Sequence, residues 1–276
     1  MPNPKANPVE NSQSASRVQI VSPGCPDRSR PDLVALEAPL ELRLHQKPAT
    51  ILMRTPGHDG ELALGFLFHE GIITSLEQVL GMDRPEPEHP DHDNILDIRL
   101  SSGARTKSLD RFFFSTSSCG ACGKKNLEAV AVRSLPVSGN FVVSPAFLST
   151  LPEKLKPHQA LFAQTGGVHA SGLFTPEGDL VCLREDVGRH NALDKIAGYA
   201  LKSGLYPLDP GILVLSGRVG YEMAQKAIVS GIPMIVAVGA PTSLAIGLCQ
   251  QFGITLVGFL RGQSMNIYTH PERVGA

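Results

Sequence analysis

Two cysteines separated by two small residues are the groups in this chain best suited to chemistry. The stretch STSSCGACGKK covers residues 115–125 and places Cys119 and Cys122 directly before Lys124 and Lys125. Nearby lysines lower the pKa of a thiol, as does the start of a helix, which we expect just after the pair. The pair could bind a metal, form a disulfide or carry a sulfur atom.

A zinc site is the first possibility for these thiols. A structural zinc site needs four ligands, and the cysteine pair supplies two. Cys25, Cys182 and Cys249 are scattered, and the last two fall in apolar patterns typical of core residues. His169 could complete a site, but it follows the cysteines and is followed by Ser171 where zinc deaminases have a glutamate. We therefore expect no metal site and no hydrolytic deamination.

The cysteines could also form a redox pair or carry sulfur. Residues 111–118 resemble a strand and residues 126–135 have helical spacing, which suits a thioredoxin-like pair. Gly120, Ala121 and Gly123 instead indicate a loop that moves, which favours a carrier. In a carrier, the thiolate attacks the outer sulfur of a donor persulfide and becomes a persulfide itself. The second thiol then stabilises or resolves that intermediate.

Length and composition limit the class of protein. The chain has 276 residues, 42% of them hydrophobic and 18% charged, which suits one or two globular domains. Its formal net charge of −1 gives no overall attraction to nucleic acid or membranes. We find no secretory signal and no apolar run long enough to span a bilayer. Five cysteines argue against a disulfide framework, so we expect a cytoplasmic protein.

The first part of the chain predicts a leader and a small α+β domain. Residues 1–31 are rich in Pro, Asn and Ser, which predicts a disordered leader. The small domain is expected at residues 32–110, with a helix at 61–71 and a surface loop at 84–94. Its expected strands, of which the first two form a hairpin, are residues 40–45, 49–55 and 95–100.

The second part predicts an α/β domain at residues 111–270, followed by a tail at 271–276. Three nearly continuous apolar runs are typical of parallel strands covered on both faces, and two segments with helical spacing lie between them. This order predicts a parallel sheet. The expected strands are residues 211–216, 233–238 and 254–259, and the expected helices are residues 221–231 and 242–253.

The parallel sheet predicts a binding edge. The segments after the three strands, residues 216–220, 239–243 and 260–264, should share one edge, where ligands of open α/β sheets bind. Helices that start there offer N–H groups to an anion, and Arg218 and Arg261 suit phosphate. We predict a site for a phosphate-bearing ligand. The alternative is that the glycines only form turns and the arginines are only solvated.

A polar segment at residues 184–195 is a second candidate. Asp186, Arg189 and His190 surround an expected helix start, where they could line a ligand pocket or lie near the thiols. The alternative is that they form a capped, salt-bridged helix. His169 follows two glycines and could also line the pocket, or it could have only a structural role.

Seven blocks of this sequence resemble the FdhD family of formate dehydrogenase accessory sulfurtransferases. Together they span about residues 39–269 and are far more specific than the cysteine pair alone. The blocks are residues 55–73, 117–124, 165–174, 184–195, 216–227, 231–245 and 256–269.

The resemblance implies a function and a fold. Cys119 would receive sulfur from a cysteine desulfurase as a persulfide, with Cys122 assisting. The sulfur would pass to the molybdenum cofactor, bis(molybdopterin guanine dinucleotide), before insertion into formate dehydrogenase. The fold would be α/β (α+β overall), with a cytidine-deaminase-like three-layer main domain and a smaller α+β N-terminal domain, assembled as a homodimer. GDP would be a mimic of the cofactor.

The resemblance places the guanine nucleotide at residues 259–264, which coincide with the predicted edge. Gln263 departs from the family, since we expect a second glycine there. The expected cofactor-binding residues are Phe259, Leu260, Arg261, Gly262, Gln263, Ser264, Arg218, Thr242, Ser243, His169, Asp186, Arg189 and His190. A cofactor-binding chaperone with incidental cysteines and a zinc-structured protein are the competing functions. Nucleic acid and membranes are not expected partners.

Overall fold

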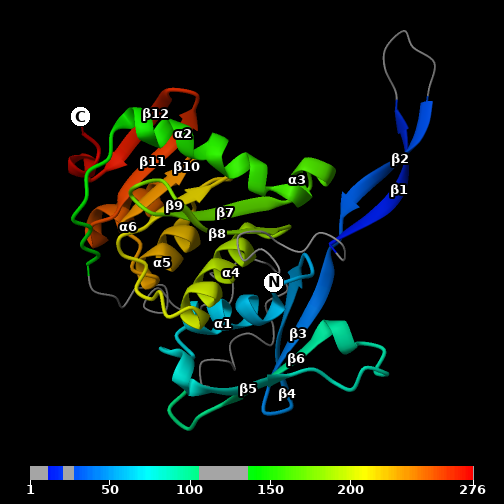
Figure 1. The fold of residues 1–276 in the computed structure, drawn as a ribbon. Helices are drawn as coiled ribbons and strands as arrows, with labels where there is room; N and C mark the ends of the chain where they lie inside the picture. The colour runs from blue at the N-terminus through cyan, green and yellow to red at the C-terminus, as the bar shows by residue number, and fades with distance from the viewer. Residues whose placement is uncertain (1–11, 21–27, 106–135, 276) are drawn as a thin grey trace.

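The computed structural model describes residues 12–20, 28–105 and 136–275, and Figure 1 shows how they are arranged. These residues form three β-sheets and six α-helices. The predicted α/β class is confirmed. The strand expected at residues 111–118 and the helix expected at 126–135 lie outside the described residues.

The largest sheet has six strands and contains the predicted parallel core. Three neighbouring strands, β9, β10 and β11, run parallel. Because β7 is antiparallel to both β9 and β8, β8 runs in the same direction as this core. In sheet order the strands are β12 (Ser264–Thr269), β11 (Thr255–Arg261), β10 (Met234–Ala237), β9 (Ile212–Leu215), β7 (His169–Phe174) and β8 (Leu180–Asp186).

Helices cover this sheet on both faces, which gives three layers (Figure 1). Leu213 and Ile235 belong to the core on the side of α4 (Arg189–Lys202), α5 (Tyr221–Val229) and α6 (Ser243–Phe252). Val214 and Val236 belong to the core beneath α2 (Pro145–Leu155), which α3 (Ala160–Thr165) follows. Because neighbouring strand residues enter opposite cores, the strands read as continuous apolar runs.

A four-stranded sheet and one helix form the predicted small unit. The strand order is β4-β3-β6-β5, and α1 (Asp59–His69) packs on it. The strands are β3 (Ala38–Leu44), β4 (Lys47–Arg54), β5 (Val79–Asp83) and β6 (Ile95–Leu100). The predicted hairpin, helix and third strand are confirmed, whereas β5 was not predicted. The division of the chain into two domains stays a prediction.

Part of the segment that was predicted to be a disordered leader forms a two-stranded ribbon. Strands β1 (Gln13–Ile20) and β2 (Arg28–Ala35) pair along their full length and project from the molecule (Figure 1). The prediction of disorder is therefore wrong for residues 13–20 and 28–31. Two bonds of Ser12 anchor the base, one from its Oγ to the Pro56 carbonyl and one from the Leu36 N–H, each at 2.8 Å. Most of the ribbon is exposed, so it lacks the apolar alternation of a half-buried strand.

Helices α1 and α4 cross in very close contact. A Cβ atom on Gly65 would lie 1.9 Å from the Asp194 carbonyl oxygen, and one on Gly198 would lie 1.9 Å from the Glu61 carbonyl oxygen. The buried Glu61 carboxylate also accepts two bonds from Arg184, at 2.6 and 3.0 Å. These contacts connect the small unit to the helix that begins beside the candidate site.

Two ion pairs connect α4 to α5, one helical turn apart. His190 of α4 pairs with Glu222 of α5, with 2.9 Å between Nε2 and Oε2. Asp194 of α4 pairs with Lys226 of α5 at 2.5 Å and also bonds to the His69 ring of α1. In the first pair α4 supplies the basic side chain and α5 the acidic one, whereas in the second pair α4 supplies the acidic side chain.

Candidate functional site

The carboxyl ends of the parallel strands form one continuous row, which we call the rim. It consists of Phe259, Gly239, Gly217 and Asp186, together with His169 at the start of the antiparallel strand β7. The Phe259 N–H donates to the Gly239 carbonyl at 3.1 Å, and the Gly239 N–H donates to the Gly217 carbonyl at 3.2 Å. A Cβ on Gly217 would lie 3.3 Å from His169 Nδ1, and His169 is paired with Asp186 across β7 and β8. The rim thus brings together segments that are distant in the sequence.

The loops after β9 and β10 lie side by side on the rim, as predicted. The Val219 N–H donates to the Ala240 carbonyl at 3.1 Å, and the Thr242 N–H donates to the Val219 carbonyl at 3.0 Å. Arg218, Thr242 and Ser243 are all exposed there. Because α5 and α6 begin in these loops, their first N–H groups also lie at this edge.

The stretch at residues 259–264 differs from the prediction. The strand was expected to end at Phe259, but β11 continues to Arg261 and turns back into β12. Residues 260–264 therefore form a hairpin that extends beyond the rim. The Leu260 side chain is 1% exposed, so its predicted role in binding can involve only its backbone. Arg261, Gln263 and Ser264 remain accessible.

A cleft lies beside this hairpin. Its volume is about 720 Å³, and part of its wall is the first residue of α2. The lining residues are Pro145, Arg261, Gln263, Ser264, Met265 and Ile267. Phe259 is 39% exposed, with a φ of 53° that is unusual for a bulky residue. An aromatic face held near the start of a polar hairpin suits stacking with a flat ring.

Asp186 makes structural contacts within the protein, and its role in cofactor binding stays a prediction. Its buried carboxylate pairs with Lys195 Nζ at 2.7 Å. It also accepts bonds from Gly188 N–H at 2.8 Å, Asn191 Nδ2 at 3.0 Å and Thr55 N–H at 3.2 Å. Because these partners occupy both oxygens, Asp186 fixes the turn between β8 and α4 and joins it to the small unit. The salt bridge to Lys195 agrees with the interpretation as a salt-bridged helix start, although no side chain caps α4.

Arg189 and His190, the other two residues of this polar group, affect the electrostatics of His169 on the rim. Burial lowers the pKa of His169, and the positive charges of Arg189, His190 and Arg218 lower it further. Arg189, His190 and Arg218 thus contribute to the electrostatic environment of His169 at this end of the rim. His190 is held by Glu222 of α5, a residue that was not predicted. Its position at the start of a helix after a parallel strand is the signal that could have identified it.

The predicted catalytic residues Cys119 and Cys122 lie outside the described residues, as do Lys124 and Lys125. Cys182 and Cys249 are fully buried core residues, as predicted. Burial raises the pKa of each to about 12, which leaves their thiols protonated and unreactive at neutral pH. Neither of them is suited to carry sulfur.

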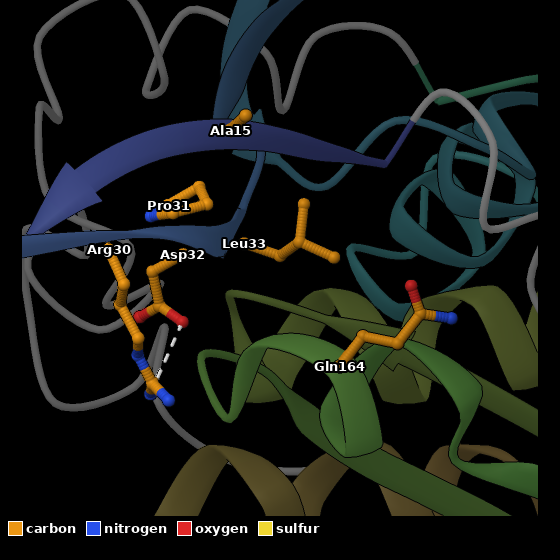
Figure 2. Close-up of a pocket in the computed structure, with 6 residues that line it drawn as sticks. All are labelled: Ala15, Arg30, Pro31, Asp32, Leu33 and Gln164. Atoms are coloured by element: carbon orange, nitrogen blue, oxygen red, sulfur yellow. Dashed lines mark ion pairs between the residues drawn. The ribbon is translucent and has the colours of Figure 1, made fainter.

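A second cleft lies between the ribbon and α3. Figure 2 shows the Gln164 side chain across from Leu33 and Asp32 of β2. The cleft has a volume of about 390 Å³. The charged Arg30 and Asp32 side chains in it pair with each other at 3.9 Å. This cleft offers no concentration of reactive groups.

The described residues contain neither a candidate metal cluster nor a candidate membrane-spanning helix. In residues 12–20, 28–105 and 136–275, no cluster of three or more His, Cys, Asp or Glu side chains could hold a metal ion. Across the same residues, no helix has the length and apolar composition needed to cross a bilayer.

Fold and rim together define a three-layer α/β protein whose parallel strands end at a row of cationic side chains and helix starts, an arrangement suited to anionic ligands. The chain belongs to the FdhD/NarQ family, whose model matches residues 35–275. The resemblance found in the sequence is therefore confirmed.

Curated relatives match this chain over most of its length. It is 45% identical over 254 residues to the sulfur carrier protein FdhD of Streptomyces coelicolor, which covers 89% of this chain and 90% of that protein. It is 44% identical over 256 residues to the protein of the same name from Mycobacterium tuberculosis, covering 89% and 93%.

A solved structure has the same fold. It is a putative formate dehydrogenase accessory protein from Desulfotalea psychrophila, with a TM-score of 0.76 and 24% sequence identity. The match covers 96% of this chain and 100% of that one. The likeness to cytidine deaminase stays a prediction.

Proposed function

We propose that this protein is a sulfur carrier that serves the maturation of formate dehydrogenase. It accepts sulfur from a cysteine desulfurase as a persulfide on Cys119 and passes it to the molybdenum cofactor, its anionic substrate. The observation that carries this proposal is the 45% identity over 254 residues to a protein named sulfur carrier protein FdhD, in a chain that contains a CxxC pair. The name of the Desulfotalea protein supports formate dehydrogenase as the client.

The sulfur transfer needs two balanced steps. In the first, the Cys119 thiolate attacks the outer sulfur of the donor persulfide, so one S–S bond forms and another breaks, and the donor leaves as a thiolate. In the second, the Cys122 thiolate attacks Cys119, which forms a disulfide and releases the outer sulfur as sulfide for the cofactor. A cellular thiol then reduces the disulfide. In this role the protein is a sulfurtransferase.

The rim and its hairpin supply the binding side of this function. The cofactor carries guanine and phosphate groups, and the exposed residues Phe259, Arg261 and Ser264 suit a flat base and polar substituents. Arg218 and Thr242 lie farther along the same edge, where they suit phosphate. GDP is therefore the simplest probe of this site. A homodimer in the cytoplasm is the setting that we propose for it.

Intact-mass measurement tests the carrier function directly. After incubation with a cysteine desulfurase and cysteine, the protein should gain about 32 Da, the mass of one sulfur atom, and the gain should disappear on reduction. Cys119→Ala should abolish the gain. Cys25→Ala is the matched control and should leave it unchanged. A full mass gain in Cys119→Ala would remove Cys119 as the carrier.

A cofactor-binding chaperone is the second candidate, because the cationic rim would serve it equally well. It predicts that a chain lacking both Cys119 and Cys122 still restores formate dehydrogenase activity in cells without the native protein. The carrier function predicts no restoration by this double variant, with full restoration by Cys25→Ala.

A further inference from the structure

The ribbon of β1 and β2 projects from the molecule and is supported on one side (Figure 1). Helix α3 contacts β2, and a Cβ on Gly167 would lie 3.3 Å from the Ala35 side chain. No described strand pairs with the other edge of β1, where residues 14–17 are exposed. A two-stranded ribbon alone is only marginally stable in water, whereas sheets of three or more strands are stable more often. A further strand beside β1 would therefore stabilise the ribbon.

The register of the ribbon shows which backbone groups lie on its outer edges. The Leu36 N–H donates to the Ser12 carbonyl at 2.8 Å, and the pairing that follows has no bulge. Because hydrogen-bonded pairs alternate along an antiparallel ladder, the even-numbered residues of β1 bond to β2. The odd-numbered residues of β1, from 13 to 19, therefore direct their N–H and C=O groups outward.

The two outer edges of the ribbon differ in their capacity to accept a strand. Pro31, which has no N–H, falls at an outward position of β2 and so removes a donor from that edge. Strand β1 has no proline, and its central residue Ala15 lies between Ser14 and Ser16, which are also small. Arg17 is the single charged residue of β1. An edge with these properties is a template for pairing with another strand.

Gln13, at the base of β1, has a buried acceptor that lacks a partner. Its Oε1 makes no hydrogen bond within the part of the chain that the structure describes. A buried acceptor left unpaired costs about 1–3 kcal/mol, and proteins contain few of them. A donor that a second molecule brings to this edge would offset that cost.

We propose that β1 pairs with β1 of a second copy of this chain, antiparallel about a two-fold axis at Ala15. The two ribbons then form one four-stranded sheet, in which Gln13 lies opposite Arg17 of the second copy. Three pairs of outward-directed residues each exchange two backbone hydrogen bonds. Residues opposite each other have Cβ atoms about 4.5–5.5 Å apart, so the Arg17 guanidinium is a donor within reach of Gln13 Oε1.

The charge and the apolar side chains of the ribbon favour this register. An axis at Arg17 would set two guanidinium groups opposite each other, which is destabilising, whereas an axis at Ala15 separates them. Leu33 is 38% exposed and pairs with Ala15, so the four-stranded sheet has an apolar row across all its strands. This interface would belong to the homodimer that the proposed function includes, but it does not depend on the cysteines or on sulfur transfer.

Sedimentation velocity of the full chain over a range of concentrations tests this interface. The wild-type chain should associate into dimers. Ala15→Pro removes an outward N–H and leaves the bonds between β1 and β2 intact, so it should weaken the association by about 10-fold or more. Ser29→Pro is the matched control, because Ser29 is exposed and lies at an outward position of β2. It should leave the association unchanged.

An engineered disulfide measures the same pairing in a second way. In a chain whose Cys25, Cys119 and Cys122 are replaced by serine, Ala15→Cys should form an intermolecular disulfide on mild oxidation. The reason is that Cα atoms of a hydrogen-bonded antiparallel pair lie about 5.5 Å apart, which suits a disulfide. Ser29→Cys is the control and should not cross-link, because β2 lies on the far side of each ribbon from the axis.

Three results would overturn the proposal. The first is a wild-type chain that stays monomeric at its highest soluble concentration. The second is an unchanged association in Ala15→Pro, which would place the contact between copies elsewhere on the molecule. The third is cross-linking of Ala15→Cys that does not exceed that of Ser29→Cys. The gain of sulfur mass on Cys119 tests the carrier function alone, so failure of one proposal is distinguishable from failure of the other.

Discussion

Replacing Gly198 by alanine should destabilise the protein strongly, because α1 and α4 touch at this residue. The new Cβ would lie 1.9 Å from the Glu61 carbonyl oxygen, whereas ordinary contact begins at 3.4 Å. The helices must therefore separate by about 1.5 Å. Overpacking of this kind costs about 1–3 kcal/mol, and alanine returns about 1 kcal/mol through its helix propensity.

The separation should also weaken the buried pair between Glu61 and Arg184. Breaking such a pair completely costs about 3–5 kcal/mol, so partial disruption brings the expected loss of folding free energy to about 3 kcal/mol. Gly65→Ala should have a similar effect. The double variant should lose less than the sum, because both substitutions force the same separation.

Urea unfolding followed by circular dichroism measures this loss. Gly247→Ala is the matched control, since Gly247 is exposed in α6 and its new Cβ would meet nothing within 4 Å. It should be neutral or stabilising by up to about 1 kcal/mol. A Gly198→Ala protein whose free energy of unfolding lies within about 1 kcal/mol of wild type would refute the close crossing of α1 and α4.

We make three further predictions, two for buried ion pairs near the rim and one for the hairpin. Burial would raise the pKa of Glu61, but hydrogen bonds from a neighbouring histidine and Arg184 outweigh it and lower the pKa from 4.5 to about 2. Because the folded-state pKa is below the unfolded value, the ionised carboxylate stabilises the protein above pH 4.5, and about 3 kcal/mol of folding free energy should be lost as the pH falls from 4.5 to 2. In urea unfolding, Glu61→Gln should show a smaller pH dependence over that range. Lys195→Met leaves the Asp186 carboxylate buried without its cation, which should cost about 3–5 kcal/mol in thermal or urea unfolding; a near-neutral effect would contradict the buried pair. Arg261→Gln should weaken GDP binding by about 1.5–3 kcal/mol in calorimetry, and an unchanged affinity would remove Arg261 from the nucleotide site.

The sequence was sufficient to predict the parallel core and the rim. Strands β9, β10 and β11 are covered on both faces, so their apolar runs are unambiguous, and parallel order alone places the loops after them at one edge. The ribbon formed by β1 and β2 was missed, because exposed strands need no apolar alternation.

The roles of the rim residues were harder to predict. The contacts of Asp186 were not foreseen in full because one of its partners is distant in the sequence: the Thr55 N–H is 131 residues away. The same holds for Glu222, whose pairing with His190 depends on how α4 and α5 pack. Leu260 lies within a polar motif, yet the hairpin turns its side chain into the core. In each case tertiary contacts outweighed the local pattern.

The reversed pairs between α4 and α5 fix how far one helix can slide along the other. In the observed register, His190 faces Glu222 and Asp194 faces Lys226. A shift by one helical turn in one direction would set Asp194 against Glu222, and a shift in the other would set His190 against Lys226. Either displacement breaks both observed pairs, and the first also places two carboxylates together. The two pairs therefore oppose sliding of α4 along α5 and hold the starts of both helices in a fixed position at the rim.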